Sequence, residues 1–213
     1  MLRTFAYVRA GSLADALKQL DATNSRAHAG GTDLLGCLRD GAMTADTVVS
    51  IGHLADLKGI TPTPDGGLRL GALTTIAEIA GHGVIKDKYS ALSQAAAVVA
   101  SPQLRNQGTL GGNLCQRPRC WYFRGDYECS RKGGDLCYAA EGENQYHAIF
   151  GGSLCHIVHP SDTAPALVAL GASVRVAGPK GTRVVPLETF FVLPDVDVQK
   201  ETVLGQGEIV TEV

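Results

Sequence analysis

Cysteine is the residue type in this 213-residue sequence with the most chemistry to offer. Four of the six cysteines are separated by eight, seven and seventeen residues: Cys120, Cys129, Cys137 and Cys155. No Cys-x-x-Cys pair occurs, so a zinc ribbon is not indicated and the cysteine run of bacterial ferredoxins is excluded. No signal peptide is visible, which favours metal or redox use of the thiols over disulfides. The spacing alone does not identify the metal.

The charge around these cysteines adds information. Residues 117–132 carry five cations against two carboxylates. A cluster held by thiolates is net negative, and nearby cations would stabilise it and lower the thiol pKa values. The aromatic run Trp121-Tyr122-Phe123 can shield such a group from water. Unligated thiols are the plain alternative. RNA binding by a basic, aromatic stretch is a weaker one, because the stretch is short and cysteines interrupt it.

Residues 29–35, Ala-Gly-Gly-Thr-Asp-Leu-Leu, form a first glycine-rich loop. Adjacent glycines let backbone N–H groups point into one concavity, where they can hold a phosphate. The loop matches neither the Rossmann nor the Walker fingerprint. Asp33 would repel a pyrophosphate if it pointed inward, so we expect it to face ribose, backbone or solvent. A tight turn between strand and helix is the structural alternative.

Residues 108–114 form a second glycine-rich loop, in which Asn113 can donate and accept hydrogen bonds. It too could be a turn, but two such loops favour a dinucleotide-like ligand between two subdomains. Further along, Ser161 and Asp162 begin a predicted helix. They can cap it, or Asp162 can take ribose hydroxyls. His156 and His159 are read as structural, and no catalytic triad or paired carboxylates stand out.

The elements that must position these residues alternate between strand and helix. Strands are expected at 3–8 and 47–51, with a helix after Ser12 between them. A Pro/Gly-rich turn at 61–67 marks a boundary, followed by helices near 75–80 and 91–100. Residues 115–150 show little periodicity, and strands are expected at 173–177, 182–187 and 208–213. The resulting α+β chain divides into residues 1–57, 58–190 with the inserted cysteine-rich loop, and a C-terminal segment 191–213.

Composition sets broader limits. Hydrophobic residues make up 45% and charged residues 19%, as in ordinary globular proteins. The net charge of −2 predicts no general attraction to nucleic acid or anionic membranes. Without a targeting segment or a membrane-spanning window, a cytoplasmic location is expected by default. Export to the periplasm with a partner subunit is the alternative.

Four motifs in order resemble one family: residues 29–35, 101–114 and 159–167, and the cysteine segment 116–152. Together they resemble the FAD-binding subunits of the xanthine dehydrogenase, or molybdenum hydroxylase, family. The cysteine segment resembles its cluster-bearing branch, which includes aldehyde oxidoreductase and 4-hydroxybenzoyl-CoA reductase subunits. The resemblance implies a two-subdomain FAD-binding fold of the PCMH type, with the family's C-terminal domain absent from this sequence.

The resemblance also assigns cofactor contacts. One group would wrap the FAD pyrophosphate, mostly by backbone: Arg26, Ala27, His28, Ala29, Gly30, Gly31, Thr32, Asp33 and Leu34. The second loop would hold the other side through Thr109, Gly112 and Asn113, and Asp162 would contact the nucleotide end. The [4Fe-4S] ligands would be Cys120, Cys129, Cys137 and Cys155, with Cys115 competing for the fourth place.

The implied role is electron transfer within a complex. A molybdenum-cofactor subunit would carry out the substrate chemistry, and a second subunit would hold two [2Fe-2S] clusters. This chain would exchange electrons between those clusters and an external acceptor through FAD. Two other functions are kept: a stand-alone flavin-dependent oxidase of a small alcohol, and a non-enzymatic metal-binding or scaffold protein. The substrate is not readable from this chain.

Overall fold

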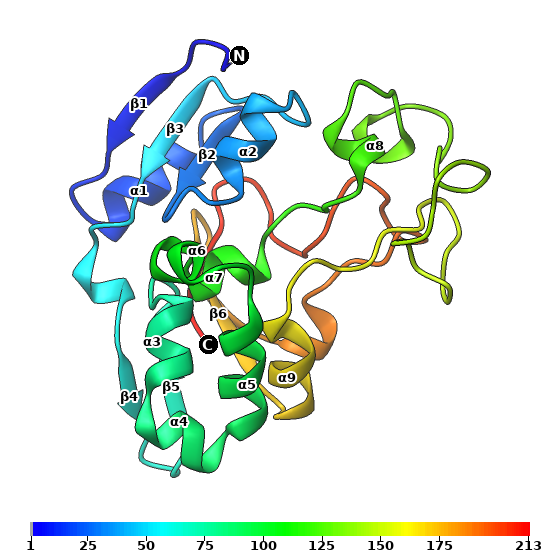
Figure 1. Cartoon of the computed structure of the whole chain (residues 1–213). Helices are drawn as coiled ribbons and strands as arrows, with labels where there is room; N and C mark the ends of the chain where they lie inside the picture. Colours follow the sequence, from blue (N-terminus) through cyan, green and yellow to red (C-terminus); the bar gives the residue numbers. More distant parts are fainter. Residues whose placement is uncertain (1) are drawn as a thin grey trace.

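The computed structural model describes residues 2–213 and shows two subdomains with a third, irregular region beside them (Figure 1). The first subdomain runs β1 (Ala6–Arg9), α1 (Leu13–Leu20), β2 (Ser25–His28), α2 (Leu34–Arg39) and β3 (Thr47–Ser50). Its strands form a parallel sheet in the order β1-β3-β2, with Ala6 and Ser25 both paired to Thr47. Parallel neighbours need crossovers, and α1 and α2 supply them. Ser12 caps α1 by accepting a hydrogen bond from the Asp15 N–H at 3.2 Å.

The second subdomain combines helices with two antiparallel sheets. A hairpin of β4 (Ile60–Pro62) and β5 (Leu68–Leu70) precedes a run of helices: α3 (Ile76–Gly81), α4 (Gly83–Lys88), α5 (Ser90–Val98), α6 (Pro102–Gln107) and α7 (Leu110–Leu114). After the irregular region come α9 (Thr163–Ala169), β6 (Ser173–Gly178), β7 (Gly181–Pro186) and β8 (Ile209–Glu212). The last three strands form a sheet in the order β7-β6-β8.

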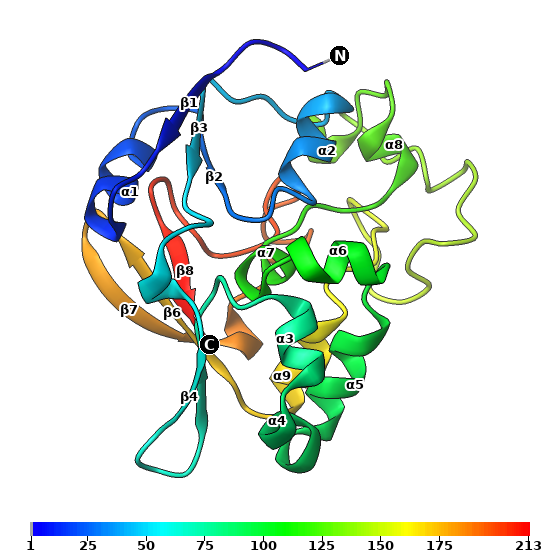
Figure 2. The same cartoon turned by 60° about the vertical axis from the view of Figure 1, so that its left-hand side comes forward.

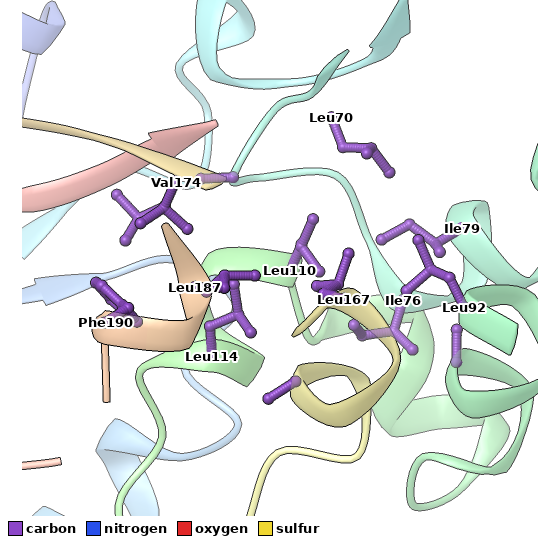
Figure 3. Close-up of a cluster of buried hydrophobic side chains, with 14 of the residues drawn as sticks. Leu70, Ile76, Ile79, Leu92, Leu110, Leu114, Leu167, Val174, Leu187 and Phe190 are labelled. Carbon is purple, nitrogen blue, oxygen red and sulfur yellow. The ribbon is translucent and has the colours of Figure 1, made fainter. Parts of the chain in front are cut away.

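The main hydrophobic core lies in this second subdomain (Figure 3). Leu110, Leu114, Leu167, Val174 and Leu187 meet there from three helical turns and a strand, each 2% exposed or less. Burying each such side chain contributes about 1.5–3 kcal/mol. The chain's last strand also ties the two subdomains together, because Ile209 packs with Leu20 and Val49 of the first subdomain. Figure 2 shows β8 running between them.

The third region is the stretch from residue 115 to residue 158, which we call the cysteine-rich lobe. Its regular structure is limited to α8 (Trp121–Arg124) and the short 3-10 turn Ser130–Lys132. In Figure 1 it stands on the far side of α7 from the helices of the second subdomain. Phe123, 1% exposed, anchors the lobe by packing with Cys37 and Ala42 at α2 and its C-terminal end.

The expected α+β class is confirmed, but several short helices were not predicted, among them α2, α4, α6 and α7. Residues 110–114, predicted as part of a glycine loop, form the short helix α7. Leu110 and Leu114 stand four residues apart and are both fully buried, so burial stabilises a helical turn that the adjacent Gly111 and Gly112 disfavour. Among the described residues, no helix has the length and apolar character needed to cross a membrane.

Candidate functional site

The first glycine loop lies where the two subdomains touch. It leaves the end of β2 and passes so close to the end of α6 that a Cβ on Gly30 would overlap the carbonyl oxygen of Gln107. Gly31 has φ +72°, a left-handed conformation that favours glycine. Both glycines are therefore required by the structure, one for close approach and one for backbone shape. A bend of this kind leaves Thr32 exposed at its tip.

A pocket of about 310 Å³ opens beside this loop, and we call it the glycine-loop pocket. Six of the predicted cofactor residues line it: Thr32, Asp33, Thr109, Gly112, Asn113 and Asp162. They come from the loop after β2, from α7 and from the start of α9. The structure thus brings together residues more than a hundred positions apart in the sequence, from both subdomains. The size is at the lower end for small-molecule sites.

Some polar groups of this pocket form hydrogen bonds within the protein, and others are available to a ligand. Ser161 caps α9 by accepting from the Ala164 N–H at 3.1 Å, whereas the Asp162 side chain makes no capping hydrogen bond. The Asp162 carboxylate is exposed at the pocket and can accept from a ligand hydroxyl. The Asn113 side-chain oxygen accepts from the hydroxyls of Ser161 and Thr163, both at 2.6 Å, so it has a structural task as well.

A larger pocket of about 670 Å³ lies beside β2, and we call it the strand pocket. Arg26 and Ala27 line it together with Cys115, Arg117 and Glu201. Burial, and secondarily the nearby Arg117, lowers the pKa of Arg26. Between this pocket and the glycine-loop pocket, the chain runs through His28, Ala29, Gly30 and Gly31. Leu34 is the first residue of α2.

One backbone segment borders both pockets. Cys115 and Arg117 line the strand pocket, whereas Gln116 and Arg119 line the glycine-loop pocket. The two pockets are therefore neighbours across the segment that leads from α7 into the cysteine-rich lobe. An extended ligand following β2 and its loop would meet both pockets.

Asp33 has an environment that the sequence only partly indicates. Its carboxylate accepts a hydrogen bond from the Arg117 backbone N–H at 2.8 Å, in line with the expectation that it faces backbone. It also binds the guanidinium groups of Arg119 at 2.8 Å and Arg124 at 2.7 Å, which was not foreseen. Both arginines belong to the cysteine-rich lobe. Asp33 thus joins the glycine loop to the lobe.

Four cysteines line one small pocket inside the lobe: Cys120, Cys129, Cys137 and Cys155. Cys115 lies elsewhere, in the strand pocket. Within residues 2–213, no three His, Cys, Asp or Glu side chains are arranged to hold a single metal ion. A cubane cluster differs from a single ion, because each thiolate binds a different iron and the sulfurs stand further apart. Four thiols lining one pocket are the type and number of ligands that such a cluster needs.

Nearby groups act on these thiols. The Arg131 Nε donates to the Cys155 Sγ at 3.5 Å, and the His147 Nε2 lies 3.1 Å from the Cys120 Sγ. Burial raises the pKa of Cys120, opposed by backbone N–H groups at the start of α8, and the neighbouring Cys129 and Cys155 raise it further. Several thiolates this close together need cationic partners.

Two cysteines outside this pocket are held as neutral thiols. Burial, with a smaller effect of Glu201, raises the pKa of Cys115 to about 12. Burial, with a smaller effect of Asp33, raises the pKa of Cys37 to about 11. Neither thiol lines the pocket that the other four cysteines share.

A buried ion group borders the cysteine pocket and the strand pocket. Glu201 pairs with Arg131 at 2.6 Å and with Arg117 at 2.9 Å. Arg131 is 3% exposed and Glu201 is 7% exposed. Burial raises the pKa of Glu201, while the two arginines oppose this effect. Sequence patterns do not indicate this group, because Glu201 lies 70 or more residues from both arginines.

Comparison with known proteins identifies the family of the chain. The model of the family described as "FAD binding domain in molybdopterin dehydrogenase" matches residues 3–129 and 133–213. The chain belongs to this family. It is an oxidoreductase flavoprotein domain, and the predicted cofactor FAD and the resemblance to FAD-binding subunits of the xanthine dehydrogenase family are confirmed.

Individual relatives agree with the family. The chain is 37% identical, over its whole length, to the aldehyde oxidoreductase FAD-binding subunit PaoB of Escherichia coli K12, of which it covers 68%. It is 40% identical over 52% of its length to the xanthine dehydrogenase FAD-binding subunit of Escherichia coli O157:H7, of which it covers 38%. A solved CO dehydrogenase from Oligotropha carboxidovorans shares the fold, with a TM-score of 0.72 at 22% identity. The chain covers 59% of that chain's length.

Proposed function

We propose that this chain is the electron-transfer flavoprotein component of a molybdenum-cofactor oxidoreductase, of the aldehyde or aromatic and N-heterocycle hydroxylase type. It would pass electrons between iron–sulfur clusters and an external acceptor. The observation that carries the proposal is the arrangement of three pockets around residues 115–124. Two pockets suited to an extended dinucleotide border this segment, and a four-cysteine pocket lies at its other end.

The two larger pockets support an extended FAD. The glycine-loop pocket offers backbone at Gly112, the Thr32 hydroxyl and the Asp162 carboxylate, which suit a pyrophosphate and a ribose. The strand pocket has about twice the volume and is bordered by Arg26 and Arg117, which suits the flavin end. FAD, when bound, supplies one- and two-electron redox chemistry. The chain's own residues bind and orient it, and no acid–base pair is needed.

The cysteine pocket supports a [4Fe-4S] cluster with Cys120, Cys129, Cys137 and Cys155 as ligands. Its walls include Tyr122, Phe123 and Tyr138, which limit contact with water. Arg131 supplies a cation beside Cys155. Cys115 is the poorer candidate, because it lines a different pocket.

The names of two relatives support a role for this chain within a larger complex, because both are described as FAD-binding subunits. We propose a molybdenum-cofactor subunit and a [2Fe-2S] subunit as the partners in a heterotrimeric type of complex. The molybdenum subunit would select the substrate.

The test is a cofactor assay on the chain purified without oxygen, alone and with its partner subunits. We expect bound FAD, together with iron and acid-labile sulfide at about four each per chain. Absence of FAD under all conditions would overturn the flavoprotein role. Zinc in place of iron and sulfide would overturn the cluster alone. Turnover of a small alcohol by the isolated chain would favour the stand-alone oxidase.

A matched pair of variants tests the fourth ligand. Cys155→Ser removes one of the four thiols that line the cysteine pocket, and Cys115→Ser removes a half-buried thiol outside it. We expect Cys155→Ser to lose the cluster's visible absorption and most of the iron, and Cys115→Ser to keep both. The reverse result would assign Cys115 as the ligand.

A further inference from the structure

We propose that Asp33 is a latch between the FAD loop and the cysteine-rich lobe, so that order in the lobe and FAD occupancy strengthen one another. The proposal rests on the proposed function and adds a regulatory link to it. Asp33 then acts through the arginines it holds and not by touching the cofactor with its carboxylate.

The ionic contacts of Asp33 are with the lobe, and within its own subdomain the carboxylate accepts a weak hydrogen bond from the Cys37 Sγ at 3.8 Å. One carboxylate oxygen accepts from Arg119 and Arg124 at 2.8 and 2.7 Å, and the other accepts from the Arg117 backbone N–H at 2.8 Å. Asp33 and Arg124 are mostly buried, with side chains 16% and 13% exposed. Arg124 is in turn fixed, since its Nε donates to the Pro118 carbonyl at 2.8 Å. Hydrogen bonds between charged groups are roughly twice as strong as neutral ones.

The charge balance explains why a carboxylate is tolerated beside a pyrophosphate site. An unpaired Asp33 would repel the two negative charges of a pyrophosphate. With Arg119 and Arg124 in place, the group carries a net positive charge, and Arg119 itself lines the glycine-loop pocket. The lobe therefore changes the electrostatic potential at the FAD loop from unfavourable to favourable.

The same part of the lobe holds the cysteine pocket. Cys120 lies between Arg119 and Arg124 in the sequence, and Phe123 and Cys129 pack with Cys37 of α2. A filled cysteine pocket would fix Cys120 and Cys129, and with them the arginines that reach Asp33. Coupling of this type is reciprocal and typically changes affinity about 5- to 150-fold.

Asp33→Asn tests the latch by the sign of its effect. If Asp33 only repels FAD, removing its charge will tighten FAD binding. If Asp33 is the latch, the variant will bind FAD at least about fivefold more weakly, because the lobe is released. FAD affinity is measured by flavin fluorescence on the full chain. The control is Asp46→Asn, which removes an exposed carboxylate of the same subdomain that binds Asn24 and no arginine.

A second readout does not depend on affinity. FAD is added to the full chain, and proteolysis within residues 115–158 is followed over time. We expect FAD to slow cleavage at least about fivefold in the unaltered chain and in Asp46→Asn. We expect little protection in Asp33→Asn or in Arg124→Gln.

The outcomes are distinct. Tighter FAD binding by Asp33→Asn, or equal protection of its lobe by FAD, would refute the latch while leaving FAD binding established. A chain that binds no FAD in any form refutes the proposed function instead. Weaker binding with loss of protection, seen in Asp33→Asn and absent in Asp46→Asn, supports the latch.

Discussion

Glu201→Gln should destabilise the protein far more than the loss of one surface charge would. The carboxylate lies between Arg131 and Arg117, at 2.6 and 2.9 Å. The variant keeps the shape of the side chain but leaves Arg131, whose side chain is 2% exposed, without its counter-charge. Removing one partner of a buried pair typically costs about 3–5 kcal/mol.

The local structure points to the lower end of that range. Arg131 keeps two other acceptors, the Lys200 carbonyl at 3.1 Å and the Cys155 Sγ at 3.5 Å. The side chain of Arg117 is 22% exposed and can be solvated. We therefore expect a loss of about 3 kcal/mol in the free energy of unfolding. Domains of this kind have about 5–15 kcal/mol in total.

The assay is anaerobic urea unfolding followed by circular dichroism. The midpoint should fall with little change in slope, since the folded shape is kept. Glu188→Gln is the matched control, because Glu188 is exposed in a short helical turn and should change stability by less than about 0.5 kcal/mol. The double variant Arg131→Met, Glu201→Gln should lose less than the two single losses added together. A loss below about 1 kcal/mol for Glu201→Gln would refute the reasoning.

Three further predictions concern Gly30 in the first glycine loop, Asn113 at the end of α7, and the ion pair of Glu208 beside β8. Gly30→Ala should cost about 1–3 kcal/mol and weaken FAD binding, since the added methyl overlaps backbone; unchanged values for both in denaturation and flavin titration would contradict this. Asn113→Ala should cost about 1–3 kcal/mol in the same unfolding assay by depriving two buried hydroxyls of their acceptor, and a neutral result would show that they find another. The Arg183 hydrogen bond lowers the pKa of Glu208, so this stabilisation is present above the ordinary glutamate pKa of about 4.5 and is lost as pH falls through the lower folded value. Melting temperature against pH should therefore fall less steeply below pH 4.5 in Glu208→Gln than in the unaltered chain, and parallel curves would contradict the assignment.

The sequence predicted those parts of the fold that depend on local pattern. The cap at Ser12 and the apolar spacing after it define α1, and glycines mark the loop after β2. It predicted the glycine loops as ligand sites, and six of the named residues do meet in one pocket. Their contacts with FAD remain predictions, as do the four cluster ligands.

The features that the sequence did not predict depend on contacts between residues far apart in the chain. Asp33 meets Arg124 across 91 positions, and Arg131 meets Glu201 across 70. A charge pair at such separations leaves no periodic trace in either segment. The choice between Cys155 and Cys115 was open for the same reason, because spacing does not say which thiols share a pocket. The helix α7 was not predicted because the low helix propensity of its two glycines exceeds the favourable propensity of its two leucines. In the folded chain, burial of the leucines stabilises the helix nevertheless.

The Asn113 hydrogen bonds have a consequence for the evolution of the chain. They join the residue just before the cysteine-rich lobe to Ser161 and Thr163, just after it. The stem of this insertion is thus closed independently of what lies between its ends. Loop-closure cost grows slowly, by about 0.6 kcal/mol for each doubling of length. A short hairpin in place of the forty-odd residues of the lobe would therefore close at little entropic cost, but it would also remove the arginines that pair with Asp33 and Glu201. Gain or loss of the lobe should thus be accompanied by changes at these two carboxylates.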